Sequence, residues 1–505
     1  MQEKSKIKLK LSFCLYVKNV DKRTNSEYNK DVKLRSIAPK TERRKQKMKT
    51  MTLKKLIALL TALLMSWGII AAPAAPEKPD GGIVADSTID FNDSDPGCAG
   101  STVSVSSNYD GEYSVFWGTA DGEKLSAKNA SGAEIPYSRF AKITVENGEG
   151  SETLSEFLAI PEGAQTVLLY YGDELLDKDA VPAEKINAYD GKIYSFGALS
   201  DVHFGRYFDG TKDKSDTSFP RALNFLDSLG VSMVGMSGDL SFAGETSSFK
   251  KVSKYSAEHD FPVFTCRGNH DCGNKLNTKM WQKYLNKGVY GENPREGVLA
   301  VADNGYDFVF RGEESHGDVF IFFSQISGVY APGVRLVTDK QLNWLEEQFE
   351  AHKDERVYLF FHTFLNAPDG EPEMGEGNLI NDYGKSYNLP YRTGNKDEKR
   401  FRSLLEEYKN VTFFNGHSHF TYDMQSYNPR LNITDYDGTT ATMVHVSSCA
   451  APRTTGPLQP KLTSNSGTMS EGLFITVYPS YIIVTACDFV GGQFLAYANY
   501  RINNR

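Results

Sequence analysis

The stretch Ile193-Tyr-Ser-Phe-Gly-Ala-Leu-Ser-Asp201-Val-His203 decides how the larger part of this chain folds. Its apolar run is short, which suits a buried strand rather than a helix, and it ends in an aspartate and a histidine. Val231–Met236 and Pro262–Thr265 repeat the pattern, since each is β-prone and is followed within three residues by a polar cluster that contains glycine. The sequence therefore predicts strands that end in chemically active side chains.

Helical segments separate these strands, which is typical of α/β architecture. Pro220–Leu229 stops at Gly230, and Asp339–His352 opens with a Thr338-x-x-Gln341 capping box. Further strands of this part are predicted at Val319–Ser324, Val357–Phe361 and Val411–Phe414. The chain then returns to strands that we expect to complete a second sheet, at Met443–Val446, Leu473–Val477, Ile482–Thr485 and Phe494–Tyr497.

The preceding part of the chain shows a different pattern. Residues 75–91 are rich in Pro, Gly, Ala and Asp, which is typical of a linker. Residues 92–188 contain short alternating apolar runs broken by turn residues, with no competing helical period. They predict a small β-sandwich of the fibronectin or immunoglobulin type, in which aromatic residues such as Trp117 belong to the core.

Potential metal ligands stand directly after the predicted strands of residues 192–505. Because strand carboxyl ends meet at one edge of an open α/β sheet, we expect these side chains to converge. Carboxylate, imidazole and amide groups together suit Mn, Fe or Zn better than Mg or Ca, and their number suits two ions that hold a hydroxide and clamp phosphoryl oxygens. The set is Asp201, His203, Asp239, Asn269, His270, His362, His417 and His419.

Five sequence blocks carry a resemblance to a known family. In chain order they are D-x-H at 201–203, G-D at 238–239, G-N-H-D at 268–271, a lone His362 after an apolar strand, and G-H-x-H at 416–419. Each block alone is a weak signal, but their joint order resembles the calcineurin-like metallophosphoesterases. The resemblance covers residues 192–505 and implies a double-sheet α-β-β-α sandwich that hydrolyses phosphomonoesters or phosphodiesters.

The resemblance also implies a role for each residue. Asp201, His203 and His419 would bind one metal, and Asn269, His362 and His417 the second. Asp239 would bridge the two ions, which would hold a bridging hydroxide as the nucleophile. His270 would protonate the leaving group and Asp271 would orient its imidazole. Asn269 and Arg267 are candidates for contact with the substrate.

One sequence block differs from that of a related group of enzymes. A β-sandwich followed by a metal domain is similar to the layout of purple acid phosphatases, which carry a tyrosine ligand in a G-D-x-x-Y block. Here the block reads Gly238-Asp239-Leu240-Ser241-Phe242, and phenylalanine has no oxygen to offer. His203, at a position where those enzymes generally have glycine, supplies a nitrogen instead. The sequence therefore predicts a complete two-metal site without the purple tyrosinate centre.

Charge and the N-terminal pattern indicate an exported protein. Residues 1–50 hold 16 Lys/Arg and 5 Asp/Glu, which leaves 40 basic and 59 acidic residues in the rest, a balance that disfavours nucleic-acid binding. The sequence predicts a signal peptide over residues 48–74, which contains Lys54-Lys55, the apolar run Leu56–Ala72 and the cleavage pattern Ala72-Pro73-Ala74. We then expect residues 1–47 to come from an upstream start codon. We expect an extracellular, periplasmic or cell-surface location, with an uncleaved membrane anchor as the minor alternative.

The sequence leaves several questions open. Five cysteines follow the signal peptide, and a Cys449–Cys487 disulfide is conceivable in an exported protein. The substrate is expected to be a small phosphoester or a lipid head group, and the β-sandwich would be available for contact with the cell envelope. The loops 204–218, 272–299, 363–394 and 450–467 should set specificity, the acidic third one by disfavouring highly charged substrates. The alternative is a non-catalytic binding protein whose metal domain is a relic.

Overall fold

A computed structural model of the chain describes residues 78–504 except 92–96, 100–101, 187–188, 190, 206–213, 273–277, 329–333, 366–396, 424–430, 437, 457–458 and 465–467. The upstream extension, the signal peptide and nearly all of the acidic loop 363–394 lie outside the described residues. The described residues contain no helix long and apolar enough to cross a membrane. Cys449 and Cys487 are free thiols, so the conceivable disulfide between them is not formed.

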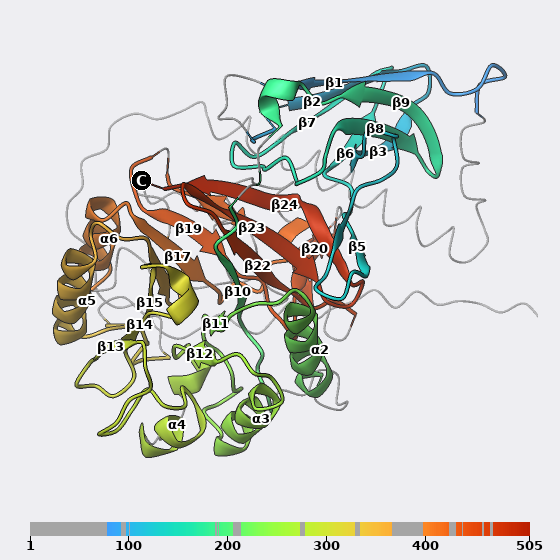
Figure 1. Cartoon of the computed structure of the whole chain (residues 1–505). Coiled ribbons are helices and arrows are strands. Elements are labelled where there is room, and N and C mark those ends of the chain that lie inside the picture. Colours follow the sequence, from blue (N-terminus) through green and yellow to red (C-terminus); the bar gives the residue numbers. More distant parts are fainter. Residues whose placement is uncertain are drawn as a thin grey trace, which may run out of the picture. The chain divides into compact units, whose positions relative to one another are not determined.

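Two sheets form the centre of the larger part (Figure 1). The six-stranded sheet has the order β12-β11-β10-β22-β23-β24, and the seven-stranded sheet the order β13-β14-β15-β16-β17-β19-β18. The first sheet consists of β10 (Tyr194–Leu199), β11 (Val234–Met236), β12 (Val263–Thr265), β22 (Glu471–Val477), β23 (Tyr481–Asp488) and β24 (Gln493–Asn503). The second consists of β13 (Val298–Val301), β14 (Phe308–Phe310), β15 (Val319–Phe322), β16 (Val357–Phe360), β17 (Val411–Asn415), β18 (Ile433–Thr434) and β19 (Thr442–His445).

The predicted strands are all present, but the last ones are distributed differently from the expectation. β19 joins the seven-stranded sheet beside β17, whereas β22 pairs antiparallel with β10 and extends the six-stranded sheet. Both sheets therefore combine parallel and antiparallel strands, and in the six-stranded sheet the parallel strands β12, β11 and β10 form one half. The strands that carry the metal-ligand blocks are the parallel ones, because β10, β11 and β12 run in one direction, as do β15, β16, β17 and β19.

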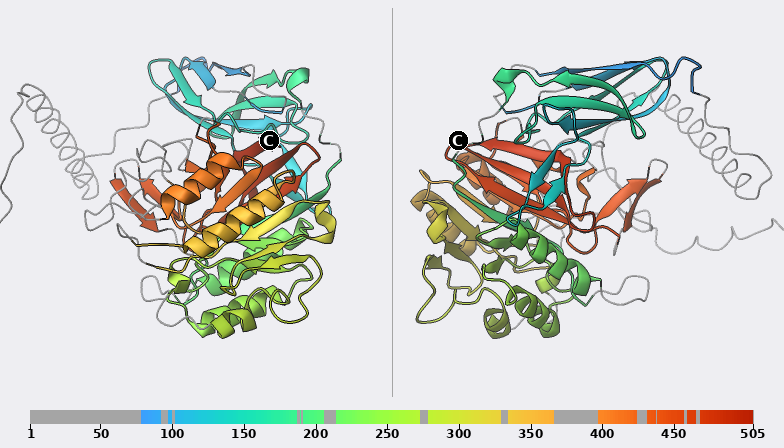
Figure 2. Two further views of the ribbon diagram at one scale, coloured as in Figure 1. Left: turned by 90° about the vertical axis from the view of Figure 1, so that its left-hand side faces the viewer. Right: turned by 45° about the vertical axis from the view of Figure 1, so that its right-hand side comes forward.

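Figure 2 shows how the sheets and helices are arranged, and the buried apolar side chains define the layers. Phe196, Phe360 and Val484 belong to a core between the two sheets. Gly235 lets the sheets approach there, because a Cβ at this position would collide with the Phe360 ring. The opposite face of the seven-stranded sheet packs on α5 and α6, and that of the six-stranded sheet on α2, α3 and α4. This arrangement is the predicted α-β-β-α sandwich.

The helices of this part are α2 (Ser215–Ser228), α3 (Thr246–Ser256), α4 (Thr278–Tyr284), α5 (Asp339–Ala351) and α6 (Glu398–Glu407). The Thr338–Gln341 capping box of α5 is present as predicted. Helix α2 begins five residues before the expected Pro220, which lies inside the helix. Helix α4 falls within the segment 272–299 that was expected to be a loop, because seven residues are too few to produce a clear helical period.

The N-terminal strands form the predicted β-sandwich. One sheet has the order β1-β2-β7 and the other β6-β3-β8-β9. The strands are β1 (Ala85–Asp90), β2 (Thr102–Ser107), β3 (Gly111–Gly118), β4 (Ser126–Lys128), β5 (Glu134–Pro136), β6 (Ala141–Val145), β7 (Glu149–Thr153), β8 (Thr166–Tyr171) and β9 (Glu174–Ala180). Trp117 is a core residue stacked on Phe140 at 4.1 Å. Strand β1 lies in the segment expected to be a linker, where Ser87 and Ile89 alternate with exposed polar residues.

The sandwich packs on the last strand of the six-stranded sheet. The Ala159 amide donates to the Asn499 carbonyl at 2.7 Å, and the Ser138 amide donates to the Phe494 carbonyl at 2.9 Å. Ala496 of β24 is part of the sandwich core. Lys78–Arg505 accordingly form one compact unit.

A buried carboxyl group in β22 predicts a pH-dependent stability. Glu471 is buried and accepts a hydrogen bond from the Tyr422 amide at 3.2 Å. Burial raises the pKa of Glu471 to about 8. Because the unfolded chain loses this proton first, the free energy of unfolding should fall as the pH rises from about 4.5 to 8, by at most about 1.4 kcal/mol per pH unit.

Glu471→Gln should lack this component. Urea unfolding between pH 5 and pH 9 should show the advantage of the variant over wild type growing with pH. Exposed Glu347→Gln on α5 is the matched control and should follow wild type. An unchanged difference between Glu471→Gln and wild type across this range would contradict the prediction.

Candidate metal centre

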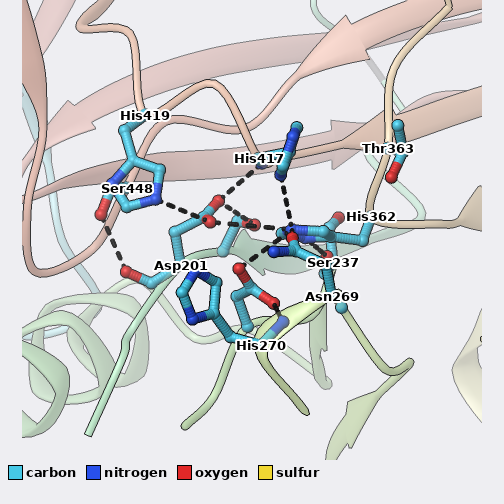
Figure 3. Close-up of polar contacts among 12 residues, drawn as sticks. Asp201, Ser237, Asn269, His270, His362, Thr363, His417, His419 and Ser448 are labelled. Carbon is cyan, nitrogen blue, oxygen red and sulfur yellow. Dashed lines mark hydrogen bonds and ion pairs between the residues drawn. The ribbon is translucent and has the colours of Figure 1, made fainter. Parts of the chain in front are cut away.

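The predicted ligands lie in the loops that follow five parallel strands. Asp201 and His203 come after β10, Asp239 after β11, and Asn269 with His270 after β12. His362 follows β16, and His417 with His419 follow β17. The structure brings all of these side chains to one edge, across both sheets (Figure 3).

Several of these residues have a backbone conformation that is rare for side-chain-bearing amino acids. Left-handed φ angles occur in few non-glycine residues and cost roughly 1–3 kcal/mol each, so they persist where the surrounding structure holds them. Five residues of the site have such angles: Asp201 (53°), His203 (50°), Asp239 (53°), His417 (73°) and His419 (61°). The fold thus maintains backbone strain at the ligands themselves.

Glycines in the blocks allow the loops to touch. A Cβ at Gly238 would lie 2.6 Å from the Gly268 amide nitrogen, and one at Gly268 would lie 2.5 Å from the Asp239 nitrogen. A Cβ at Gly416 would overlap with Ser200 Oγ and come within 2.6 Å of Asp201 Oδ2. The glycines of the G-D, G-N-H-D and G-H-x-H blocks therefore serve close packing between loops.

The first group of ligand atoms surrounds Asp201. Its Oδ1 lies 3.0 Å from His419 Nε2 and 3.4 Å from His203 Nε2, and the two imidazole nitrogens are 3.0 Å apart. Its Oδ2 accepts hydrogen bonds from Ser200 Oγ at 2.7 Å and from the His417 amide at 2.9 Å. One oxygen of Asp201 is thus held by the protein, while the other faces two histidines.

The second group surrounds His362. Its Nε2 lies 3.0 Å from Asn269 Oδ1, 3.2 Å from Asp239 Oδ2 and 3.3 Å from His417 Nδ1. Asp239 Oδ2 is also 3.5 Å from His203 Nε2 in the first group. Asp239 therefore stands between the two groups, the position that a bridging ligand requires.

Backbone carbonyls fix the orientation of the imidazoles. His362 Nδ1 lies 2.7 Å from the Ser237 carbonyl, and His419 Nδ1 lies 3.0 Å from the Ala451 carbonyl. A carbonyl only accepts, so each Nδ1 donates its proton, and Nε2 is the nitrogen that faces the centre of the site. This is the second contact that metal-binding histidines commonly make.

Burial and mutual attraction separate the charges of the site. Burial lowers the pKa of His203 and of His417 to about 3, which keeps both imidazoles neutral. Burial also opposes a charge on His362, but attraction to Asp239 and Asp201 outweighs it and raises the pKa of His362 to about 9. Burial would raise the pKa of Asp201 and Asp239, yet the neighbouring histidines hold both below their usual value. Both aspartates are therefore anionic, and the imidazoles of His203 and His417 are neutral.

His270 lies at the rim, and the expected role of Asp271 needs correction. His270 donates from Nδ1 to the Phe242 carbonyl at 2.6 Å, and its amide donates to Asp239 Oδ1 at 2.8 Å. The buried Asp271 carboxylate instead accepts from the Ser241 hydroxyl at 2.7 Å and from the Ser241, Gly268 and Leu240 amides. Within the described residues, the Asp271 carboxylate is hydrogen-bonded to these groups and not to His270.

Arg267 is also placed differently from the expectation. Its side chain is only 6% exposed, and the guanidinium lies 4.2 Å from the centre of the Tyr306 ring. It also lowers the pKa of Asp307, whose main shift is an increase caused by burial. These contacts favour a structural role for Arg267 rather than contact with the substrate.

The sequence patterns did not identify several residues that hold the ligands in place. The Ser448 hydroxyl donates to the Asp201 carbonyl at 2.8 Å, and Ser200 and Ser237 hold ligands through the contacts given above. Ser448 follows β19, the neighbour of β17, so its place after a parallel strand was the one available signal. His445, expected in the core or near the ligands, is buried and donates to the Phe420 carbonyl, while its other nitrogen lies 3.5 Å from Ser418 Oγ.

The arrangement fits metal ions. Asp201 Oδ1 is buried and has no hydrogen-bond partner in the described part of the chain, although two imidazole nitrogens face it. Three clusters place their ligand atoms within 4.8 Å of one another: Asp201 with His203 and His419, Asp239 with His362 and His417, and His203 with Asp239 and His270. Mixed nitrogen and oxygen donors of this kind suit transition-metal ions.

Comparison with known proteins defines the class. Residues 194–420 match the sequence model of the calcineurin-like phosphoesterase family. Residues 194–420 therefore form a calcineurin-like phosphoesterase domain, which supports a metal-dependent hydrolase that acts on phosphoester bonds. A search of curated protein sequences found no match.

Three solved structures illustrate the distant structural likeness. A purple acid phosphatase from yellow lupin (Lupinus luteus) is 14% identical, with a TM-score of 0.38 over 80% of this chain and 72% of that one. A predicted phosphoesterase from Streptococcus pneumoniae is 10% identical, with a TM-score of 0.24 over 61% and 97%. Vacuolar Protein Sorting 29 from Cryptosporidium parvum is 7% identical, with a TM-score of 0.26 over 62% and 100%. Likenesses this weak add nothing to the family match.

Proposed function

We propose that the chain is an exported phosphohydrolase that uses two metal ions to cleave phosphomonoesters or phosphodiesters. The observation that carries the proposal is Asp239, whose Oδ2 faces His362 of one ligand group and His203 of the other. Asp201, His203 and His419 would hold one ion, and Asn269, His362 and His417 the second. We expect Mn, Fe or Zn, since five imidazole nitrogens lie among the ligands and the rim.

The chain's own residues would prepare the site and handle the leaving group. When bound, the two ions supply a hydroxide nucleophile at neutral pH and neutralise charge on the phosphoryl oxygens. His270 donates its Nδ1 proton to the Phe242 carbonyl, so its Nε2 is left for the substrate. Protonated His270 gives its Nε2 proton to the leaving-group oxygen as the P–O bond breaks. Asp271 would support the site indirectly, because its carboxylate accepts hydrogen bonds from the amides of both Ser241 and Gly268 and so holds the two loops together.

The direct test is hydrolysis of a nitrophenyl monoester and a bis-nitrophenyl diester by protein reconstituted with Mn, Fe or Zn. We expect turnover with at least one metal and loss of turnover on removal by a chelator. His270→Ala should retain metal, measured by elemental analysis, and lose about a hundredfold or more in kcat, the usual contribution of a general acid. The ratio of monoester to diester turnover would assign the subclass.

A folded protein that binds metal but cleaves neither ester would overturn this proposal. That result would favour a binding protein with a relic metal domain, and the β-sandwich would be the place to look for its partner, such as a component of the cell envelope. The proposed substrate is a small phosphoester or a lipid head group. The 40 basic and 59 acidic residues that follow residue 50 disfavour a nucleic acid, whose phosphates require a basic surface.

Export is supported by the N-terminal sequence, where Lys54-Lys55, the run Leu56–Ala72 and the Ala72-Pro73-Ala74 site follow one another. Mass spectrometry of the protein recovered outside the cytoplasm of an expression host should find Ala75 as the first residue. An intact N-terminus on protein that remains in the cytoplasm would refute export. Membrane-bound protein that retains Leu56–Ala72 would establish the anchored alternative.

A further inference from the structure

An exposed aromatic ring borders the leaving-group side of the metal centre. Phe242 is 41% exposed, and its ring centre lies 5.4 Å from that of His270 at an interplanar angle of 31°. His270 also lies beside His203, with ring centres 4.7 Å apart. The imidazole that would protonate the leaving group is thus a neighbour of both a ligand and the exposed ring.

The backbone and the ring of Phe242 have separable functions. Its carbonyl accepts the His270 Nδ1 proton and orients the imidazole, a contact that any residue at this position can make. The phenyl ring has no part in that hydrogen bond. Neighbouring loops tie the backbone, since the Phe242 amide donates to the Phe204 carbonyl at 2.9 Å. The partial exposure of the ring therefore requires an explanation other than the orientation of His270.

A second exposed apolar residue lies close to the same block of sequence. Ile326 is 42% exposed in the segment that follows β15. This segment packs on the G-N-H-D loop, because a Cβ at Gly328 would lie 2.6 Å from the Asn269 carbonyl oxygen and Cys272 Sγ lies 3.3 Å from the Gln325 carbonyl. Two of the few large apolar residues exposed in the described part of the chain therefore border the loop that carries His270. Exposed apolar surface at a polar site indicates a ligand with an apolar portion.

We propose that Phe242 is a specificity-determining residue whose ring packs against an aromatic leaving group, so that aryl or nucleoside-like phosphoesters are preferred over small alkyl phosphoesters. The inference rests on the proposed function, because the leaving group is defined by the reaction at the two-metal site. The ring contacts the group attached to the oxygen that His270 protonates. It takes no part in bond breaking.

The test compares leaving groups on the same phosphoryl group. Naphthyl phosphate and glycerol 2-phosphate are assayed with wild type and with Phe242→Ala and Phe242→Leu, and each variant is divided by wild type so that intrinsic reactivity cancels. Phe242→Ala should lose about tenfold in kcat/KM for naphthyl phosphate and less than about twofold for glycerol 2-phosphate, a difference of the size expected for one aromatic contact. Phe242→Leu should fall between. Leu175→Ala, 44% exposed on β9 of the β-sandwich, is the control and should match wild type on both substrates.

An equal loss on both substrates would overturn the proposal, since the ring would then act through His270, and so would no loss on either. Calorimetry with the unreactive naphthylmethylphosphonate and methylphosphonate provides a readout that does not depend on turnover. Wild type should bind the aryl compound more tightly, and Phe242→Ala should abolish the difference. If wild type binds both equally, the specificity proposal fails. If it prefers the aryl compound but hydrolyses nothing, the proposed reaction fails and the aromatic contact stands.

Discussion

Asp239→Asn should abolish phosphoester hydrolysis while leaving the chain folded. Asp239 Oδ2 lies 3.2 Å from His362 Nε2 and 3.5 Å from His203 Nε2, so it is the carboxylate shared by both ligand groups. An amide keeps the shape but removes the negative charge that two cations would share. Metal ions supply several kcal/mol of charge stabilisation to phosphoryl transfer, so we expect kcat/KM to fall by about a thousandfold or more.

The matched control is Asp318→Asn. Asp318 precedes β15, at the opposite end of the strands, where it accepts hydrogen bonds from Tyr194 and Tyr358 and pairs with Arg356. This variant should lose stability but keep its turnover per folded molecule and its metal content by elemental analysis. Asp239→Asn should show the reverse, with bound metal below that of wild type. Full activity in Asp239→Asn would show that Asp239 is not an essential ligand and would contradict the two-metal proposal.

Gly416→Ala should disrupt the site by adding a single methyl group. The new Cβ would overlap with Ser200 Oγ and lie within 2.6 Å of Asp201 Oδ2, the oxygen that the protein uses to hold Asp201. Overpacking of a well-packed interior costs about 1–3 kcal/mol in the free energy of unfolding. We expect a loss of that size in urea unfolding, together with a weaker affinity for the first metal.

Two further variants separate the overlap from a general effect of alanine. Gly312→Ala is the control, because its Cβ would meet its nearest neighbour, a Phe310 ring atom, at an ordinary 3.6 Å. Combining Gly416→Ala with Ser200→Ala removes the hydroxyl and should restore part of the lost stability. If the double variant is as unstable as the sum of the two single variants, the overlap is not the cause.

The ligands could be predicted from the sequence because they follow strands, and parallel strands must present their carboxyl ends at one edge. That rule located Asp201, Asp239 and His417 without any knowledge of the loops. The capping box of α5 and the apolar faces of the strands could also be predicted, because the local spacing of residues determines them. The four-layer arrangement then followed from the family resemblance.

What the sequence did not predict depends on contacts between loops. Asp271 adjoins His270 in the chain, yet its carboxylate serves Ser241 and Gly268, and a backbone carbonyl, which no sequence pattern reveals, orients the imidazole. The left-handed backbone at His203 and His419 also depends on contacts between loops, because positive φ angles remain uncommon for any residue other than glycine. The strand Ala85–Asp90 was missed because its composition of small and acidic residues disfavours strands when judged locally.

The position of β24 has a consequence for how the protein is made. This strand is the last element of the chain, yet its Ala496 amide binds the Ser138 hydroxyl, a contact that spans 358 residues, and the Ala496 side chain completes the core of the first domain. During synthesis the core of the sandwich therefore stays incomplete until residue 496 has left the ribosome. Contacts this distant in the chain slow folding, so a chaperone that protects the nascent sandwich should raise the yield of folded protein.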